Sequence, residues 1–351
     1  MKLQNESQTG SKRFLTGALT ALIGLTGAAQ AQSVKIDERL PDYEPTRGVS
    51  GSIKSVGSDT MNNLMTLWGE AYIGFYPNIS LEVEGKGSST APPALIAGSS
   101  TFGPMSREMK GEEVDEFQKA FGYEPTPLPT GIDMLAVYVH KDNPIGRSGL
   151  TLQQVDAIFS KTRNGGHQSD ITTWGDLGLE GEWASKPLSI YGRNSASGTY
   201  GYFKKKALFK GDFKDSVKER PGSAAVVQGV ASDKFAIGYS GIGYKTADVL
   251  AVPLAIEEGE EMVGAIATNA YTGEYPLARF LWLYVNYKPG TKLDPLRAEF
   301  IKVIFSHKGQ ENVVEDGYFP VTAEIAKRAL SSVGLTVPQL DENLKRRPGG
   351  I

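Results

Sequence analysis

Three points in the sequence share one order of parts: a strand-like run, a turn of small residues, and the start of a helix-like run. They lie at residues 56–61, 85–90 and 190–200. The N–H groups in the first turn of a helix have no partners inside the helix, so each point can offer them to a ligand. In an open α/β sheet such helix starts gather at the carboxyl ends of the strands. We therefore expect the three turns to surround one site.

The hydrophobic pattern alternates strands with helices. The predicted strands are residues 52–56, 79–84 and 134–139, and the predicted helices are residues 60–75, 92–97, 152–159 and 200–208. This alternation indicates α/β layers joined by right-handed crossovers. The chain of 351 residues exceeds one typical core, so two lobes are expected.

The third turn carries the most groups that bind an anion. Arg193 supplies a guanidinium fork, and Ser197 and Thr199 supply hydroxyl donors. Gly198 lets a ligand approach the backbone closely because it has no side chain. Together these residues predict an oxyanion socket. The alternative is an ordinary corner in which a serine caps a helix.

The first two turns carry fewer such groups. In the first, Ser58 or Asp59 is a natural N-cap, and Thr60 lies at the exposed N–H groups of the helix. In the second, Ser88 and Ser89 follow a glycine at another helix start. Either turn alone is typical of a capped helix. Three of them, all after strands, favour a shared tetrahedral anion.

A fourth segment, residues 102–107, has no evident capping role. Ser106 and Arg107 fall in a loop bent by glycine and proline, after a short strand-like run. We interpret Arg107 as a second cation for the anion. The alternative is a solvated surface arginine.

The first 31 residues are typical of a secretory signal peptide. Lys12 and Arg13 form its positive region, an apolar stretch runs from residue 14 to about residue 28, and residues 29–31 form a small-residue cleavage site. Cleavage there would export a soluble chain that begins at Gln32, and the alternative is an uncleaved anchor helix. No later segment is apolar and long enough to cross a bilayer, so the mature chain is not expected to insert in a membrane.

Composition excludes several kinds of chemistry. The absence of cysteine rules out disulfides and Cys-based zinc sites, and the three histidines lie too far apart for a metal motif. The net charge of −3, without a basic patch, argues against nucleic acid as a partner. No catalytic residue, metal ion or cofactor is predicted, because no base stands beside Ser58 or Ser197. A metal site built of carboxylates stays open.

Over nearly the whole mature chain, these motifs resemble the periplasmic phosphate-binding proteins of ABC transporters, the PstS-like group. Residues 57–60 and 87–89 match the first two phosphate loops of the family, and residues 193–199 match its most specific loop. Weaker matches are residues 137–144, 150–159, 174–177 and 284–289.

The resemblance implies an α/β fold of the two-lobed type II periplasmic binding protein class, with a hinge of two crossing segments. Lobe one would comprise residues 32–134 plus 251–351, and lobe two residues 135–250. The protein would be a periplasmic monomer and not an enzyme. It would capture inorganic phosphate between its lobes and deliver it to an inner-membrane ABC permease.

The resemblance also implies a set of phosphate ligands. By matching position, the hydroxyl donors would be Thr60, Ser89, Ser197 and Thr199, the N–H donors Met61, Gly198 and Thr199, and the cation Arg193. The remaining residues of the expected site are Ser58, Asp59, Ser88, Ser106 and Arg107.

One departure from the family bears on selectivity. Family members commonly place an aspartate at the position of Ser106, where it accepts the proton of hydrogen phosphate, and often an acidic residue at the position of Ser195. A site of donors alone would accept sulfate equally, whereas a carboxylate repels it. Asp59 or the Ser106 oxygen could supply the acceptor. The alternatives are therefore a receptor for sulfate or another tetrahedral oxyanion, a secreted phosphatase-like enzyme, or an adhesion or matrix protein on the same fold.

Overall fold

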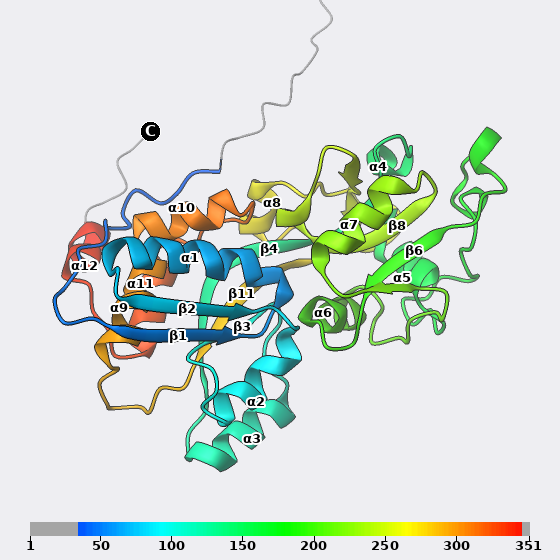
Figure 1. Ribbon diagram of the computed structural model, residues 1–351. Coiled ribbons are helices and arrows are strands. Elements are labelled where there is room, and N and C mark those ends of the chain that lie inside the picture. The colour runs from blue at the N-terminus through cyan, green and yellow to red at the C-terminus, as the bar shows by residue number, and fades with distance from the viewer. Residues whose placement is uncertain (1–33, 346–351) are drawn as a thin grey trace, which may run out of the picture. The chain divides into compact units, whose positions relative to one another are not determined.

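A computed structural model describes residues 34–345 of the chain (Figure 1). The predicted signal peptide, residues 1–31, lies outside these described residues. Within residues 34–345, every helix is too short or too polar to traverse a bilayer.

The described part of the chain alternates strands and helices, as predicted. Its strands are β1 (Gly51–Val56), β2 (Ile79–Glu84), β3 (Gly103–Met105), β4 (Thr126–His140), β5 (Leu150–Thr151), β6 (Ser189–Arg193), β7 (Lys218–Arg220), β8 (Ala236–Gly241), β9 (Val249–Ala251), β10 (Leu254–Ala255) and β11 (Ala278–Val285). Its α-helices are α1 (Asn62–Phe75), α2 (Ala91–Ile96), α3 (Gly111–Phe121), α4 (Ile145–Ser148), α5 (Leu152–Phe159), α6 (Gly198–Lys206), α7 (Ser223–Ser232), α8 (Ala267–Thr272), α9 (Pro295–Ile304), α10 (His307–Glu315), α11 (Ala323–Ser332) and α12 (Pro338–Lys345).

The strands form three sheets. β1 pairs with β2 in parallel, and so does β5 with β10. A seven-stranded mixed sheet has the order β3-β11-β4-β8-β6-β7, with β9 also paired to β4. β6 is parallel to both of its neighbours, β7 and β8.

The long strand β4 connects two hydrophobic cores. Its first part pairs with β11, and its second part pairs with β8 and β9. Met134 of β4 lies opposite Ala278 of β11, so the two strands run side by side where the chain passes between the cores. Residues 131–139 are all buried, because helices and neighbouring strands cover both faces of the sheet here.

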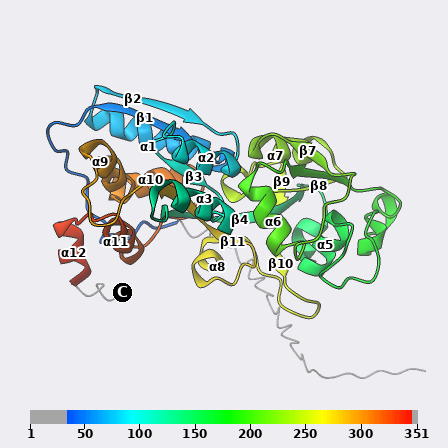
Figure 2. The same ribbon diagram turned by 90° about the horizontal axis from the view of Figure 1, so that it is seen from below.

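The first core gathers α1, β1, β2, β11 and α9 to α12. Trp68 and Tyr72 on one face of α1 are fully buried in it, and Tyr72 meets Phe300 of α9 edge to face. Figures 1 and 2 both show α1, α9, α10 and α11 grouped around this core.

The second core gathers α5, α6, β8 and the second part of β4. Phe203 of α6 stacks on Tyr239 of β8 with ring centroids 3.9 Å apart. This core also contains Val252, Leu254 and Leu277. The segment after residue 251 therefore packs with the middle of the chain, and the expectation that it returns to the first core at residue 251 does not match this packing.

Candidate anion-binding site

The first two turns and residues 102–107 are joined through their backbones. Val56 lies opposite Glu84 in the parallel pair β1–β2, so both strands end at the same edge. The Gly87 N–H donates to the Gly57 carbonyl at 2.7 Å, and the Ser58 N–H donates to the Pro104 carbonyl at 2.8 Å. The predicted neighbourhood of these three segments is confirmed.

The third turn reaches the same place from the second core. β1 and β2 point toward α6 (Figure 1). The Ser89 N–H donates to the Ala196 carbonyl at 3.2 Å, and the Thr60 and Thr199 hydroxyl oxygens lie 3.0 Å apart. Both threonines are buried. The four segments picked from the sequence thus form one contact network.

Two glycines permit this close approach. A Cβ at position 198 would lie 2.2 Å from the Ser88 hydroxyl oxygen and 2.7 Å from that of Ser106. Gly87 has a φ of +114°, and a Cβ there would lie 2.5 Å from the Ala196 carbonyl oxygen. Any side chain at position 198 would fill the space that two hydroxyls face.

Ser197 is the N-cap of α6. Its hydroxyl oxygen accepts from the N–H groups of Thr199 at 3.1 Å and Tyr200 at 3.4 Å. The capping interpretation is therefore correct, and it does not compete with anion binding, because the hydroxyl proton is still free to be donated. α6 begins at Gly198, two residues before the predicted start.

Arg193 is the most buried cation of the network, with 2% of its surface exposed. Its Nη1 donates to the Ser223 hydroxyl at 2.6 Å and lies 3.3 Å from Asp59 Oδ2. Among the described residues its Nε has no hydrogen-bond partner. Burial lowers the pKa of the Arg193 guanidinium, and the Asp59 carboxylate opposes that shift.

Asp59 does not cap its own helical turn. Ser58 holds the N-cap position without a side-chain bond, and its buried hydroxyl has no partner among the described residues. Asp59 Oδ2 instead accepts from the Ser223 N–H at the start of α7, at 2.8 Å. The Met61 N–H donates to the Ser58 carbonyl at 3.2 Å. The Asp59 carboxylate thus ties the first turn to α7 and Arg193.

Arg107 is not a solvated surface arginine. Only 8% of it is exposed, and its two Nη atoms contact the Glu113 carboxylate at 2.7 and 2.6 Å. Its Nη2 also donates to the Ser89 hydroxyl at 3.1 Å. Ser106 follows β3 as predicted, and its N–H donates to the Ser88 hydroxyl at 3.0 Å.

A third buried arginine, Arg279, was missed by the sequence analysis. Its Nη2 donates to the Thr199 hydroxyl at 2.9 Å and to Asp133 Oδ2 at 2.7 Å. Arg279 and Asp133 are direct partners on β11 and β4. The available signal was one charged residue in each of two apolar strand runs, since a buried charge in a sheet requires a partner.

Ser223 was missed as well. It receives the Arg193 guanidinium, and its N–H binds Asp59. The signal was the Gly-Ser pair at residues 222–223, just before an apolar helical run.

Two tyrosines, the buried Tyr318 and the half-buried Tyr244, hold the carbonyl groups of the first turn. The Tyr318 hydroxyl donates to the Thr60 carbonyl at 2.8 Å, and the Tyr244 hydroxyl donates to the Asp59 carbonyl at 3.0 Å. These bonds occupy backbone carbonyl groups that could otherwise accept hydrogen bonds from the hydroxyls of the site. The network is thus rich in hydroxyl and guanidinium donors, which is what a buried oxyanion requires.

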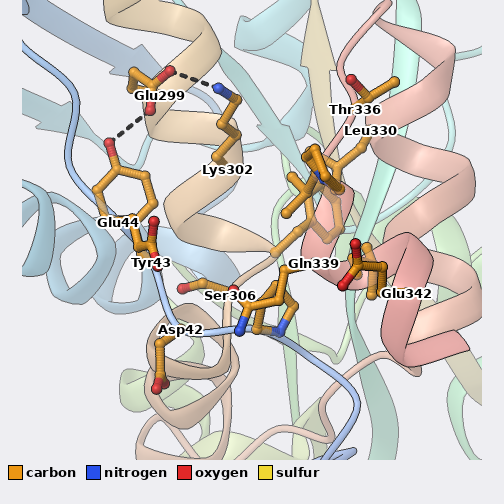
Figure 3. A pocket seen from close by; sticks show the side chains of 15 residues that line it. Asp42, Tyr43, Glu44, Glu299, Lys302, Ser306, Leu330, Thr336, Gln339 and Glu342 are labelled. Carbon is orange, nitrogen blue, oxygen red and sulfur yellow. Dashed lines mark hydrogen bonds and ion pairs between the residues drawn. The ribbon is translucent and has the colours of Figure 1, made fainter. Parts of the chain in front are cut away.

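A cavity of about 500 Å³ lies elsewhere in the fold and shares no lining residue with this network. It is bounded by residues 41–44, α9 and the start of α12 (Figure 3). Glu299 accepts there from the Tyr43 hydroxyl at 2.8 Å and from Lys302 Nζ at 2.7 Å. Nowhere in residues 34–345 do three His, Cys, Asp or Glu side chains gather in a way that could hold a metal ion.

Comparison with known proteins agrees with this geometry. The PBP superfamily domain matches residues 42–308. The phosphate-binding protein PstS of Pseudomonas aeruginosa is 54% identical over 321 residues, which cover 92% of this chain and 98% of the relative. The PstS protein of Staphylococcus haemolyticus is 27% identical over 79% of this chain and 83% of the relative.

Solved structures agree as well. A phosphate ABC transporter substrate-binding protein from Clostridium perfringens, solved with bound phosphate, matches with a TM-score of 0.65 and 27% identity, over 77% of this chain and 100% of that one. A phosphate transport receptor from Vibrio cholerae, at 20% identity and a TM-score of 0.58, covers 77% of this chain and 100% of its own and supports the fold. The chain therefore belongs to the PBP superfamily and, within it, to the PstS family of phosphate-binding proteins.

Proposed function

We propose that this protein is the solute-binding component of a phosphate ABC transporter and that it holds inorganic phosphate at the start of α6. One observation carries the proposal: hydroxyls from separate loops, Thr60, Ser88 and Ser106, converge on the turn that contains Gly198 and Thr199. A turn in which a serine only caps a helix does not require hydroxyls from other loops around it. The family membership and the phosphate-bound Clostridium perfringens relative support it.

The roles of the site residues follow from their donors. Thr60, Ser89, Ser197 and Thr199 would each give a hydroxyl proton to the phosphate, and Arg193 would supply the buried positive charge. We add Arg279 to these phosphate-binding residues. Its guanidinium can only donate hydrogen bonds, so the Thr199 oxygen is the acceptor in the bond between them. The Thr199 proton is then directed at the anion or at Thr60.

The two cores suggest how the site opens. We assign residues 34–134 and 278–345 to one lobe and residues 135–277 to the other, with the second crossing at residue 278 in place of residue 251. β4 and β11 then form the hinge, since Met134 and Ala278 face each other there. Separation of the lobes would part Thr60 from Thr199 and admit the anion.

Selectivity for phosphate over sulfate requires an acceptor for the phosphate proton. Position 106 is a serine, so it brings no carboxylate to the site. Its hydroxyl oxygen lies 3.4 Å from that of Ser88. We assign the acceptor role to Asp59, whose carboxylate lies beside Arg193. Sulfate is the second candidate ligand, and the serine at position 106 is the observation in its favour.

Membership of the family supports a proposal for the location and the partner. We propose export by the predicted signal sequence at residues 1–31, and a permease of the inner membrane as the partner of a monomeric receptor. The family binds phosphate and does not transform it, so no reaction is assigned to the site.

Titration calorimetry of the chain from residue 32 onward tests the proposal. Phosphate and arsenate are expected to bind once per chain, and sulfate at the same pH is expected to bind far more weakly. Tight binding of sulfate alone would favour the second candidate. Absence of binding by every oxyanion, or metal-dependent hydrolysis of a phosphomonoester, would overturn the receptor assignment.

A further inference from the structure

A cavity of about 470 Å³ adjoins the candidate site and is lined by five cationic side chains and a single carboxylate, that of Glu108. Three of the cations pair with carboxylates beside the cavity, whereas Lys205 and Lys206 pair with none in the described part of the chain. It lies between the loop after β3, the last turn of α6 and the start of β11. Nothing in the proposed phosphate site accounts for the unpaired charges of Lys205 and Lys206.

Two of the cations belong to both places. Arg107 and Arg279 line the cavity, and each also donates to a hydroxyl of the site, Ser89 at 3.1 Å and Thr199 at 2.9 Å. Arg279 is 6% exposed, and its Nη1 has no hydrogen-bond partner among the described residues. A buried guanidinium with an unused donor attracts an anion.

The other face of the cavity carries charge that the protein does not compensate. Lys205 and Lys206 are exposed and form no ion pair within residues 34–345, whereas the preceding Lys204 pairs with Asp212 at 2.6 Å. Lys205 and Lys206 also lie at the carboxyl end of α6, where cations are favourable. Their positive charges therefore do not destabilise the helix, and both charges are available to an anion from solution.

We propose that this cavity is an outer anion site, which receives phosphate from solution and passes it to the buried site along the wall formed by Arg107 and Arg279. The inference rests on the proposed function. The net charge of the chain is negative, so an approaching dianion is repelled over most of the surface. A local cationic cavity next to the site offsets that repulsion and raises the rate of capture.

Association kinetics test the proposal on the full exported chain. The double variant Lys205→Gln/Lys206→Gln is expected to bind phosphate roughly tenfold more slowly at low ionic strength, with an unchanged dissociation rate. The difference should vanish in high salt, because screening removes steering. The matched control is Lys288→Gln/Lys292→Gln, which removes the same charge from exposed lysines that do not line the cavity. Equal association rates for the two double variants in low salt would overturn the outer site.

A second measurement separates this inference from the proposed function. Phosphate titration of the Arg193→Ala chain, followed by phosphorus NMR, should show weak binding of two phosphates per chain, one at the weakened buried site and one at the outer site, and adding Lys205→Gln/Lys206→Gln should reduce it to one. If the wild-type chain showed no tight binding, the proposed function would be contradicted. The weak binding of the Arg193→Ala chain would then still test the outer site. Loss of all binding in Arg193→Ala alone would count against the outer site.

Discussion

At the scale of single residues, each of the three buried arginines is compensated by a carboxylate. Arg193 pairs with Asp59, Arg279 with Asp133 and Arg107 with Glu113, at 3.3, 2.7 and 2.6 Å. An isolated buried charge would be very costly, so the pairs keep the site folded without its ligand. The loosest pair is that of Arg193, which leaves this guanidinium the most available to an incoming anion.

The first prediction follows from that availability. Arg193→Ala should weaken phosphate binding by about 3 kcal/mol, roughly a hundredfold in Kd, because a buried dianion would lose its charge partner. Titration calorimetry measures the change. Arg147→Ala, on the exposed helix α4, is the control and should bind like the wild type.

The same substitution also leaves Asp59 without its cation, so folding must be checked. Arg193→Lys keeps a charge but loses the planar fork that reaches Ser223, and should fall between the wild type and Arg193→Ala. Unchanged affinity in a folded Arg193→Ala chain would contradict the assigned role.

The second prediction concerns selectivity. Asp59→Asn removes the acceptor for the phosphate proton and the carboxylate that repels sulfate. The ratio of sulfate Kd to phosphate Kd should therefore fall by a larger factor than the factor by which the phosphate Kd rises. Competition titration at constant pH measures the ratio. Asp115→Asn, an exposed position on α3, serves as the control. A constant ratio would assign the discrimination to another group.

Single residues were predictable where the chemistry is local. We could predict Arg193, Ser197 and Thr60 as site residues because each lies in a turn motif formed by its immediate neighbours in the sequence. Arg279 and Ser223 were not identified, because their importance comes from partners 80 and 30 residues away, Thr199 and Arg193. Local sequence does not encode which distant side chain a buried cation will meet.

At the scale of elements, the first turn of α6 combines stability with binding. Ser197 satisfies two N–H groups of the helix and keeps one proton to donate. Ser197→Ala should therefore cost about 1 kcal/mol of unfolding free energy and also weaken phosphate binding. Denaturant unfolding and calorimetry measure the two effects.

A matched serine separates these effects. Ser306 is the N-cap of α10 and accepts from the Gly309 N–H at 3.2 Å, far from the site in the fold. Ser306→Ala should lower stability to a similar extent and leave phosphate affinity unchanged. An equal loss of affinity in both variants would mean that Ser197 acts only through folding.

Elements with a clean hydrophobic period were predicted well. β2 and α5 have the predicted bounds, and α1 begins two residues after its predicted start because residues 59–61 form a short 3-10 turn. β4 begins at Thr126, eight residues before its predicted start. Pro127 and Pro129 interrupt the local pattern there, and pairing with β11 makes this stretch a strand.

At the scale of the whole molecule, stability should depend on pH through Asp316. Burial raises the pKa of this carboxyl to about 6, although the Asn63 amide donates to it at 2.6 Å. The pKa in the unfolded chain is about 3.9. Between these values the native state binds more protons at this carboxyl, so the contribution of Asp316 to the free energy of unfolding is greatest at low pH and is lost as the pH rises through 6.

This gives the fourth prediction. Asp316→Asn cannot ionise, so its unfolding free energy should lose less than that of the wild type between pH 5 and pH 8, by about 1.4 kcal/mol. Denaturant unfolding at the two pH values measures the difference. The exposed control Asp115→Asn should follow the wild type. Parallel pH profiles for Asp316→Asn and the wild type would contradict the role of Asp316.

The last prediction joins the two cores. Thr60 extends from the first core and Thr199 from the second, so an anion held by both binds only when both are folded. A ligand of the native state alone stabilises it by about 2.7 kcal/mol at a hundred times its Kd. Phosphate at that concentration should therefore raise the thermal midpoint and make the two cores unfold together, whereas sulfate at the same concentration should not. Differential scanning calorimetry with Arg193→Ala as the control measures this. A phosphate effect of equal size in that variant would place the stabilising anion outside the proposed site, because binding that does not use Arg193 cannot be what couples the two cores there.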